Sequence, residues 1–174
     1  MKKIAFAIAS AMVVAAMFGC AGPEAPYPNT ASVGDATVSY PDSWTDTSAD
    51  DMTILGARAS MTHVIAPDGK DSSMVALSEF TGEYAVPVDD VTSYLTSGEA
   101  SAAMGKVTFS DGSVDGLPTK ETTVSADGQD LRVVIVADES GNVAYMLVGG
   151  TTSQATEEES EQFDNILGSF HISK

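Results

Sequence analysis

The feature that most constrains the fold is a pair of nearby segments, Val133–Val136 and Ala144–Val148, that are apolar at every consecutive position. Successive side chains of a strand point to opposite faces of a sheet, so strands of this kind lie where both faces are covered. The intervening Ser140-Gly141-Asn142 contains residues that adopt positive φ at low cost, which favours a tight turn and antiparallel pairing. The sequence therefore predicts a central antiparallel pair within a larger, doubly covered sheet.

Further short segments rich in β-branched or aromatic residues, each bounded by turn residues, predict the other strands. We expect strands at Ala36–Tyr40, Met52–Ala57, Met61–Ala66, Ser73–Phe80, Val107–Ser110 and Thr119–Ser125, with the central pair extending over Leu131–Ala137 and Val143–Val148. The expected turns are Pro67-Asp68-Gly69, Asp111-Gly112, Asp115-Gly116 and Asp127-Gly128. The predicted fold class is α+β, with a mainly antiparallel central sheet of about six to eight strands covered by helices.

Two segments have helical periodicity. The first begins around Val88 to Asp90, places Val88, Val91 and Leu95 on one stripe, and is expected to resume after Gly98 and end at Gly105. The second runs from about Gln154 to Leu167, with Thr151 or Ser153 as N-cap and Gly168 as C-cap. We expect one shared core made of Trp44, Val134, Ile135, Tyr145, Leu147, Phe163, Ile166 and Phe170.

The first residues have the pattern of an export signal. Lys2 and Lys3 precede an uninterrupted apolar run from Ile4 to Phe18. A membrane-spanning helix needs roughly 20 apolar residues, and this run is shorter. Residues 1–19 are therefore predicted to be a signal peptide.

The run closes with Met17-Phe18-Gly19-Cys20, which resembles the lipobox of bacterial lipoproteins at Gly19 and Cys20, with Met17 in the place of the usual Leu and Phe18 larger than the usual residue. The resemblance implies cleavage between Gly19 and Cys20, lipidation of Cys20 with diacylglycerol, and an extracytoplasmic location anchored to the cell membrane. Ordinary signal cleavage after Ala21 is the alternative. Cys20 is the one cysteine of the chain, so no internal disulfide forms.

The rest of the chain divides into a tether and one domain. Residues 20–33 contain Pro23, Pro26 and Pro28 and predict an extended spacer, and residues 34–174 have the length of a single domain. Without Lys2 and Lys3, six of the eight Lys and Arg residues face 25 Asp and Glu, a side-chain balance of −19. Such a surface repels nucleic acid and anionic phospholipid, favours solubility, and would attract a basic partner or cations.

No recognised catalytic, metal or cofactor motif is present. His63 and His171 lack metal-ligand spacing, no Gly-x-Ser-x-Gly or Ser-x-x-Lys occurs, and Gly149-Gly150 lacks the phosphate-loop patterns. The segment Asp111–Gly116 is compared with a calcium loop and fits paired turns better. The acidic run at Glu157, Glu158, Glu159 and Glu161 suits a helix N-terminus, with a metal trap as the alternative. We therefore assign no catalytic residue, no metal ligand and no cofactor, and expect no enzyme activity.

The order of these elements, with Ser39-Tyr40-Pro41 and Trp44, Gly116-Leu117-Pro118, Ala144-Tyr145 and Ser169-Phe170-His171-Ile172, resembles the PsbP-like α/β/α sandwich over about residues 34 to 173. That resemblance implies the fold and an accessory or partner-binding role. No binding residue of the family has a matching motif here.

Two functions of different classes remain open. The first is a non-catalytic, membrane-anchored lipoprotein that binds an envelope protein or a small ligand. The second is a cell-surface hydrolase whose catalytic groups meet only in space. A cleft that brings His63 or His171 within hydrogen-bonding reach of both a Ser and a carboxylate would favour the hydrolase.

Overall fold

A computed structural model describes residues 27–97, 107–126 and 129–173. Several predicted features lie outside the described residues: the signal peptide 1–19, the cleavage and lipidation site at Gly19 and Cys20, the helical continuation between Gly98 and Gly105, and the turn at Asp127-Gly128. The strands are β1 (Asn29–Val33), β2 (Ala36–Tyr40), β3 (Trp44–Asp50), β4 (Thr53–Ile54), β5 (Ala57–Arg58), β6 (Met61–Pro67), β7 (Ser73–Glu79), β8 (Ser110–Val114), β9 (Leu117–Ala126), β10 (Gln129–Ala137), β11 (Val143–Thr152) and β12 (His171–Ile172). The helices are the 3₁₀ turn η1 (Gly82–Tyr84), α1 (Val88–Thr96) and α3 (Glu157–Gly168).

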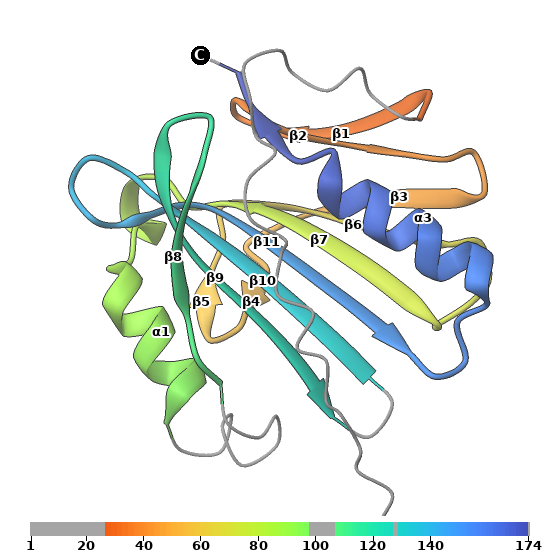
Figure 1. Ribbon diagram of the computed structural model, residues 1–174. Coiled ribbons are helices and arrows are strands. Elements are labelled where there is room, and N and C mark those ends of the chain that lie inside the picture. Colours follow the sequence, from red (N-terminus) through yellow and green to blue (C-terminus); the bar gives the residue numbers. More distant parts are fainter. Residues whose placement is uncertain (1–26, 98–106, 127–128, 174) are drawn as a thin grey trace, which may run out of the picture.

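A seven-stranded sheet in the order β3-β6-β7-β11-β10-β9-β8 forms the centre of the molecule (Figure 1). All of its neighbouring strands pair antiparallel. β11 is the middle strand and β10 lies beside it, with Val134 opposite Leu147. The predicted central pair and the α+β class with a mainly antiparallel sheet are therefore confirmed.

One face of this sheet, called here the α3 side, is covered by α3 and by a small sheet of order β1-β2-β12. Because side chains alternate along a strand, Val134 and Val136 of β10 point to this side. The core on the α3 side contains Ala31, Val33, Ala36, Val38, Trp44, Ile65, Val75, Leu77, Val114, Val136, Leu147, Phe163, Ile166, Phe170 and Ile172.

The opposite face, called here the α1 side, is covered by α1 and by the short β4–β5 hairpin. Val88, Val91 and Leu95, the stripe predicted from the sequence, are the buried residues of α1. They pack in a second core with Ala57, Ala59, Ala76, Phe80, Val133, Ile135, Val143, Met146 and Val148. Ile135 therefore does not belong to the core predicted for it, because it alternates with Val134 and faces the other side of the sheet.

Several strands differ from the prediction. Asn29–Val33, which the sequence placed in the tether, forms β1 and buries Ala31 and Val33 against the α3-side core. The single strand expected over Met52–Ala57 is a two-stranded hairpin, β4–β5, turning at Leu55 and Gly56 with positive φ. β3 was not predicted, because its seven residues are polar apart from Trp44 and Ala49.

The edge of the sheet at β8 also differs from the prediction. The turn expected at Asp111-Gly112 is wrong: both residues lie in β8, and the chain reverses at Asp115-Gly116, with φ of 49° and 82°. Gly112 lies in the strand as a glycine because the Glu121 side chain crosses it, and a Cβ would lie 2.3 Å from Glu121 Oε1.

Helix α3 begins three residues later than predicted. Its N-cap is Thr156, in a reciprocal capping box with Glu159, rather than Thr151 or Ser153. Gly168 is the last helical residue and Ser169 is the C-cap. The predicted burial of Phe163 and Ile166 is confirmed.

Candidate binding groove

The residues that the structure describes cover the α1 side of the sheet at one end and leave the other end open. Under α1 and the β4–β5 hairpin, Ile135 and Met146 are fully buried. Towards the start of β7 and the end of β11, the same face opens, and Met74 is 40% exposed. Met74 and Tyr94 are the large hydrophobic side chains that stand exposed in the described part of the chain.

This open end forms a groove of about 570 Å³, named here the α1-side groove. Its floor consists of apolar groups from β6, β7, β11, β10 and β9, and its rim is polar. The floor residues are Val64, Ala66, Met74, Val124, Leu131 and Gly150, and the rim residues are Lys70, Asp71, Ser72, Ser73, Gln129, Asp130, Thr151 and Thr152. The volume lies within the range of about 300–1,000 Å³ typical of ligand sites.

Gly150 keeps the middle of this floor open. A Cβ at Gly150 would meet nothing closer than Asp130 O and Met74 Cγ, both at 4.0 Å, so the groove has unfilled space above this position. The neighbouring Gly149 faces the other side, where a Cβ would lie 2.9 Å from the Phe163 ring. Gly149 is thus needed for packing of α3, whereas Gly150 is open to substitution.

The charges on the rim are unbalanced. Lys70 Nζ donates to Glu159 Oε1 at 2.5 Å, so its charge is already compensated. Asp71 lies beside it, and Asp130 accepts from the Ser125 hydroxyl across the β9–β10 pair. The two aspartates leave the rim with a net negative charge.

Glu159 fixes the loop that carries part of this rim. Glu159 is 6% exposed, and its carboxylate accepts from Lys70, from Ser72 Oγ at 3.3 Å and from the Thr156 backbone N–H at 2.8 Å. The hydrogen bond from Lys70, followed by that from Thr156, lowers the pKa of Glu159 from 4.5 to about 2. The acidic residue that the sequence assigned to the helix N-terminus therefore also joins α3 to the β6–β7 loop.

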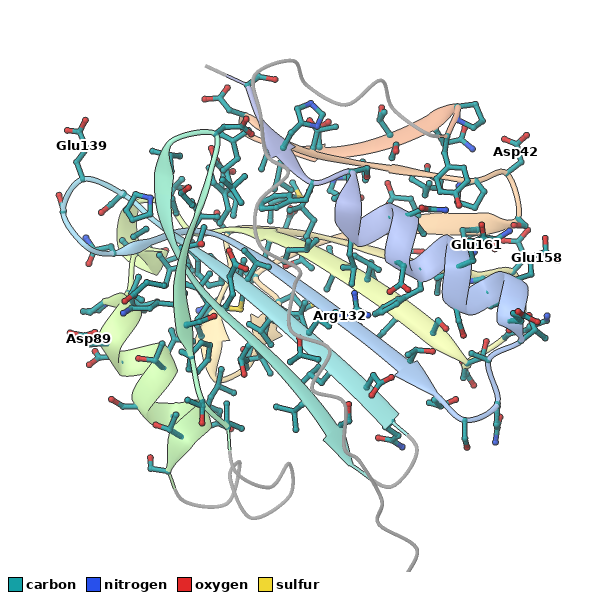
Figure 2. The ribbon with its side chains drawn as sticks, in the orientation of Figure 1. Asp42, Asp89, Arg132, Glu139, Glu158 and Glu161 are labelled. Carbon is teal, nitrogen blue, oxygen red and sulfur yellow. The ribbon has the colours of Figure 1, made fainter. Side chains whose placement is uncertain are left out.

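The other glutamates of α3 point outwards. Figure 2 shows Glu158 and Glu161 projecting from α3, and both are exposed. No group of three or more His, Cys, Asp or Glu in the described ranges is arranged to hold a metal ion. In the segment Asp111–Gly116, for which the sequence favoured paired turns over a calcium loop, Asp111 pairs with Lys120 at 2.5 Å and Asp115 Oδ2 accepts from the Ile172 N–H at 2.7 Å.

A second groove, of about 540 Å³, lies on the α3 side between α3 and the strands β8 to β11. Arg132 crosses it, pairing with Asp164 at 2.8 Å and lying 5.8 Å above the centre of the Phe163 ring (Figure 2). This ion pair links the sheet to α3, so we regard the second groove as part of the helix packing.

Neither histidine lines the α1-side groove or the second groove. His63 Nδ1 lies 2.7 Å from Asp46 Oδ2, and both side chains are largely buried between β6 and β3. His171 Nδ1 donates to the Ser169 carbonyl oxygen at 3.1 Å. Among the hydrogen bonds of the described residues, no serine hydroxyl reaches either ring.

Sequence reasoning missed both the α1-side groove and the His63–Asp46 pair. Asp46 is 17 residues from His63 and reaches it only through the β3–β6 register. The groove combines the ends of five strands, so no local motif marks it.

Comparison with known proteins adds little. No protein-family model matches the chain, and no curated protein sequence matches it. A crystal structure of a protein from Bacteroides thetaiotaomicron VPI-5482 is similar at a TM-score of 0.40 and 11% identity, covering 80% of this chain and 46% of that chain. The chain thus spans less than half the length of that protein, and the likeness is too distant to support a function. No helix in the described ranges is long and apolar enough to span a membrane.

Proposed function

We propose that this chain is a non-catalytic binding module, anchored outside the cytoplasm by a lipid on Cys20, that binds its partner in the α1-side groove. The observation that carries the binding role is the apolar end of the sheet around Met74, which no described residue covers. A floor of apolar groups with a polar rim is the usual composition of a binding site. Exposed methionines suit such surfaces because the thioether adapts to irregular partners.

The anchor rests on the leader sequence. Lys2, Lys3 and the apolar run Ile4–Phe18 end at Gly19-Cys20, where a thiol is available for the thioether. The alternative remains cleavage after Ala21, which would release the domain unlipidated. Intact mass of the mature protein distinguishes the two products.

The finer family hypothesis, a PsbP-like sandwich, belongs to this proposal. It draws support from a central antiparallel sheet with helices packing on it, and from Trp44 buried after the Pro41 turn. An accessory, partner-binding role is what that resemblance implies.

The hydrolase alternative is supported by one observation, the His63–Asp46 pair. A carboxylate that contacts Nδ1 orients an imidazole to act as a general base. A hydrolase would also need a nucleophilic hydroxyl at the ring, and no described hydrogen bond joins a hydroxyl to His63. Hydrolysis of a chromogenic ester by the wild type and its loss in His63→Gln would favour this alternative over the binding module.

The binding role is tested by photo-crosslinking in intact cells. A benzophenone amino acid is placed at Met74, and, as a control, at Glu161 on the opposite side of the molecule. We expect an adduct of one defined mass from Met74 only. Gly150→Phe, which fills the groove from its floor, should abolish the adduct, whereas Thr30→Phe on the exposed surface of β1 should not. Equal adducts from Met74 and Glu161, or no effect of Gly150→Phe, would contradict the proposal.

A further inference from the structure

We infer that the occupant of the α1-side groove is an extended, basic peptide segment of another protein, with apolar side chains at alternate positions. This inference rests on the proposed binding function and specifies its partner. It follows from the shape of the groove, the charge of its rim and the side of the domain on which it lies.

The shape favours an extended chain. The lining runs from β6 through β7, β11 and β10 to β9, which are successive neighbours in the sheet. Four steps of about 4.8 Å give a length of about 19 Å, which an extended peptide of about six residues spans at about 3.3 Å per residue. Alternate side chains of such a peptide would point down onto Met74, Leu131 and Val64 and up into solvent.

The charge favours a basic chain. Asp71 and Asp130 both lie along the side of the groove where the strands meet the β6–β7 loop and the start of β10. The one cation of the lining, Lys70, is held by Glu159. Arg58, Lys120 and Arg132, the other described Lys and Arg residues, do not line the groove, so the two aspartates of its rim favour a cationic partner.

The position of the groove favours a partner in the aqueous space. Tyr27, the first described residue, packs against the α3-side core, and its hydroxyl accepts from Asn165 of α3 at 3.3 Å. The chain from a lipidated Cys20 therefore reaches the domain on the α3 side, within about 25 Å even when fully extended. The central sheet lies between Tyr27 and the groove, so the groove is on the side of the domain opposite the point where the tether joins it and stays accessible to a partner.

The test uses three fluorescein-labelled hexapeptides and fluorescence anisotropy with the full mature chain. The first peptide alternates Lys and Val, the second alternates Glu and Val, and the third has the Lys and Val residues in two blocks. We expect the alternating Lys peptide to bind and the other two to bind about tenfold more weakly or less, because only it combines the required charge and spacing. Its affinity should fall as salt is raised.

Variants locate the interaction. Gly150→Phe should abolish binding and Thr30→Phe should leave it unchanged, while Asp71→Asn with Asp130→Asn should weaken it and flatten its salt dependence. Circular dichroism of each variant confirms that it folds.

The failures of the inference and of the proposed function are distinguishable. The inference is overturned if the Glu peptide binds as tightly as the Lys peptide. It is also overturned if a cationic detergent, dodecyltrimethylammonium, binds in the groove and no peptide does. In both cases the groove binds something other than a basic peptide. The inference is also overturned if every probe binds and Gly150→Phe weakens the binding of none of them. A Met74 crosslink in cells that Gly150→Phe fails to abolish contradicts the proposed function itself.

Discussion

The packing of α3 on the sheet predicts a large, position-specific cost for Phe163→Ala. Phe163 is 1% exposed and its ring lies directly against Gly149 of β11, where even a Cβ would approach within 2.9 Å. Truncating a fully buried Phe removes its burial free energy and leaves a cavity, a loss of about 3–5 kcal/mol. At about 3 °C per kcal/mol for a domain of this size, the melting temperature should fall by about 10–15 °C.

A second substitution tests whether the contact is the one the structure shows. Gly149→Ala in the wild type forces the Phe163 ring and Leu167 Cδ2 away, and overpacking of this kind costs about 1–3 kcal/mol. In the Phe163→Ala background the new methyl group enters the vacated space, so Gly149→Ala should cost much less there.

The measurement is urea unfolding of the four proteins, followed by circular dichroism, with Glu161→Ala as an exposed control on the same helix. The control should stay within about 0.5 kcal/mol of the wild type. A loss below about 1 kcal/mol for Phe163→Ala, or equal costs of Gly149→Ala in both backgrounds, would refute the placement of α3.

Three further predictions concern single residues. The pKa of Glu159 is lowered from 4.5 to about 2, so its stabilisation is complete above pH 4.5 and is lost as pH falls towards 2; the wild-type melting temperature should therefore fall more between pH 6 and pH 3 than that of Glu159→Gln. Cys20→Ser should abolish lipidation, moving the protein from the detergent to the aqueous phase or leaving an uncleaved precursor, as intact mass will show. Asp115→Ala should accelerate hydrogen exchange at the Ile172 amide and cost about 1–2 kcal/mol, whereas Asp115→Asn, which keeps an acceptor and tolerates positive φ, should stay near the wild type.

The sequence predicted the elements whose burial leaves a local pattern. Val133–Val136 had to be central because both of its faces are apolar, and the Val88, Val91 and Leu95 stripe defined the buried side of α1. The edge strands β3 and β8 carry no such pattern, because polar residues and a glycine suffice where one side meets solvent. The assignment of Ile135 to the same core as Val134 was wrong because consecutive residues of a strand point to opposite faces of the sheet, so the two side chains belong to different cores.

The candidate groove could not be predicted, because its floor is assembled from strand ends that are distant in sequence. The nearest local signal was Met74, a large apolar residue at the start of a predicted strand. In the structure it lies on the same face as the buried Ala76 and is nevertheless exposed. Only the fold shows that α1 stops short of it. Similarly, the partly buried ion pair of Glu159 with Lys70 joins residues 89 positions apart in the chain, a separation that no local spacing pattern covers.

Hydroxyl-radical footprinting of Met74 tests the central claim most directly, since it requires no knowledge of the partner. Met74 at 40% exposure should oxidise readily in the purified protein and be protected in the native cell envelope, where the partner fills the groove. Tyr94, 52% exposed and outside the groove lining, serves as the internal control and should be modified equally in both preparations. Equal oxidation of Met74 in both, or its protection already in the purified protein, would contradict the assignment of the α1-side groove as the binding site.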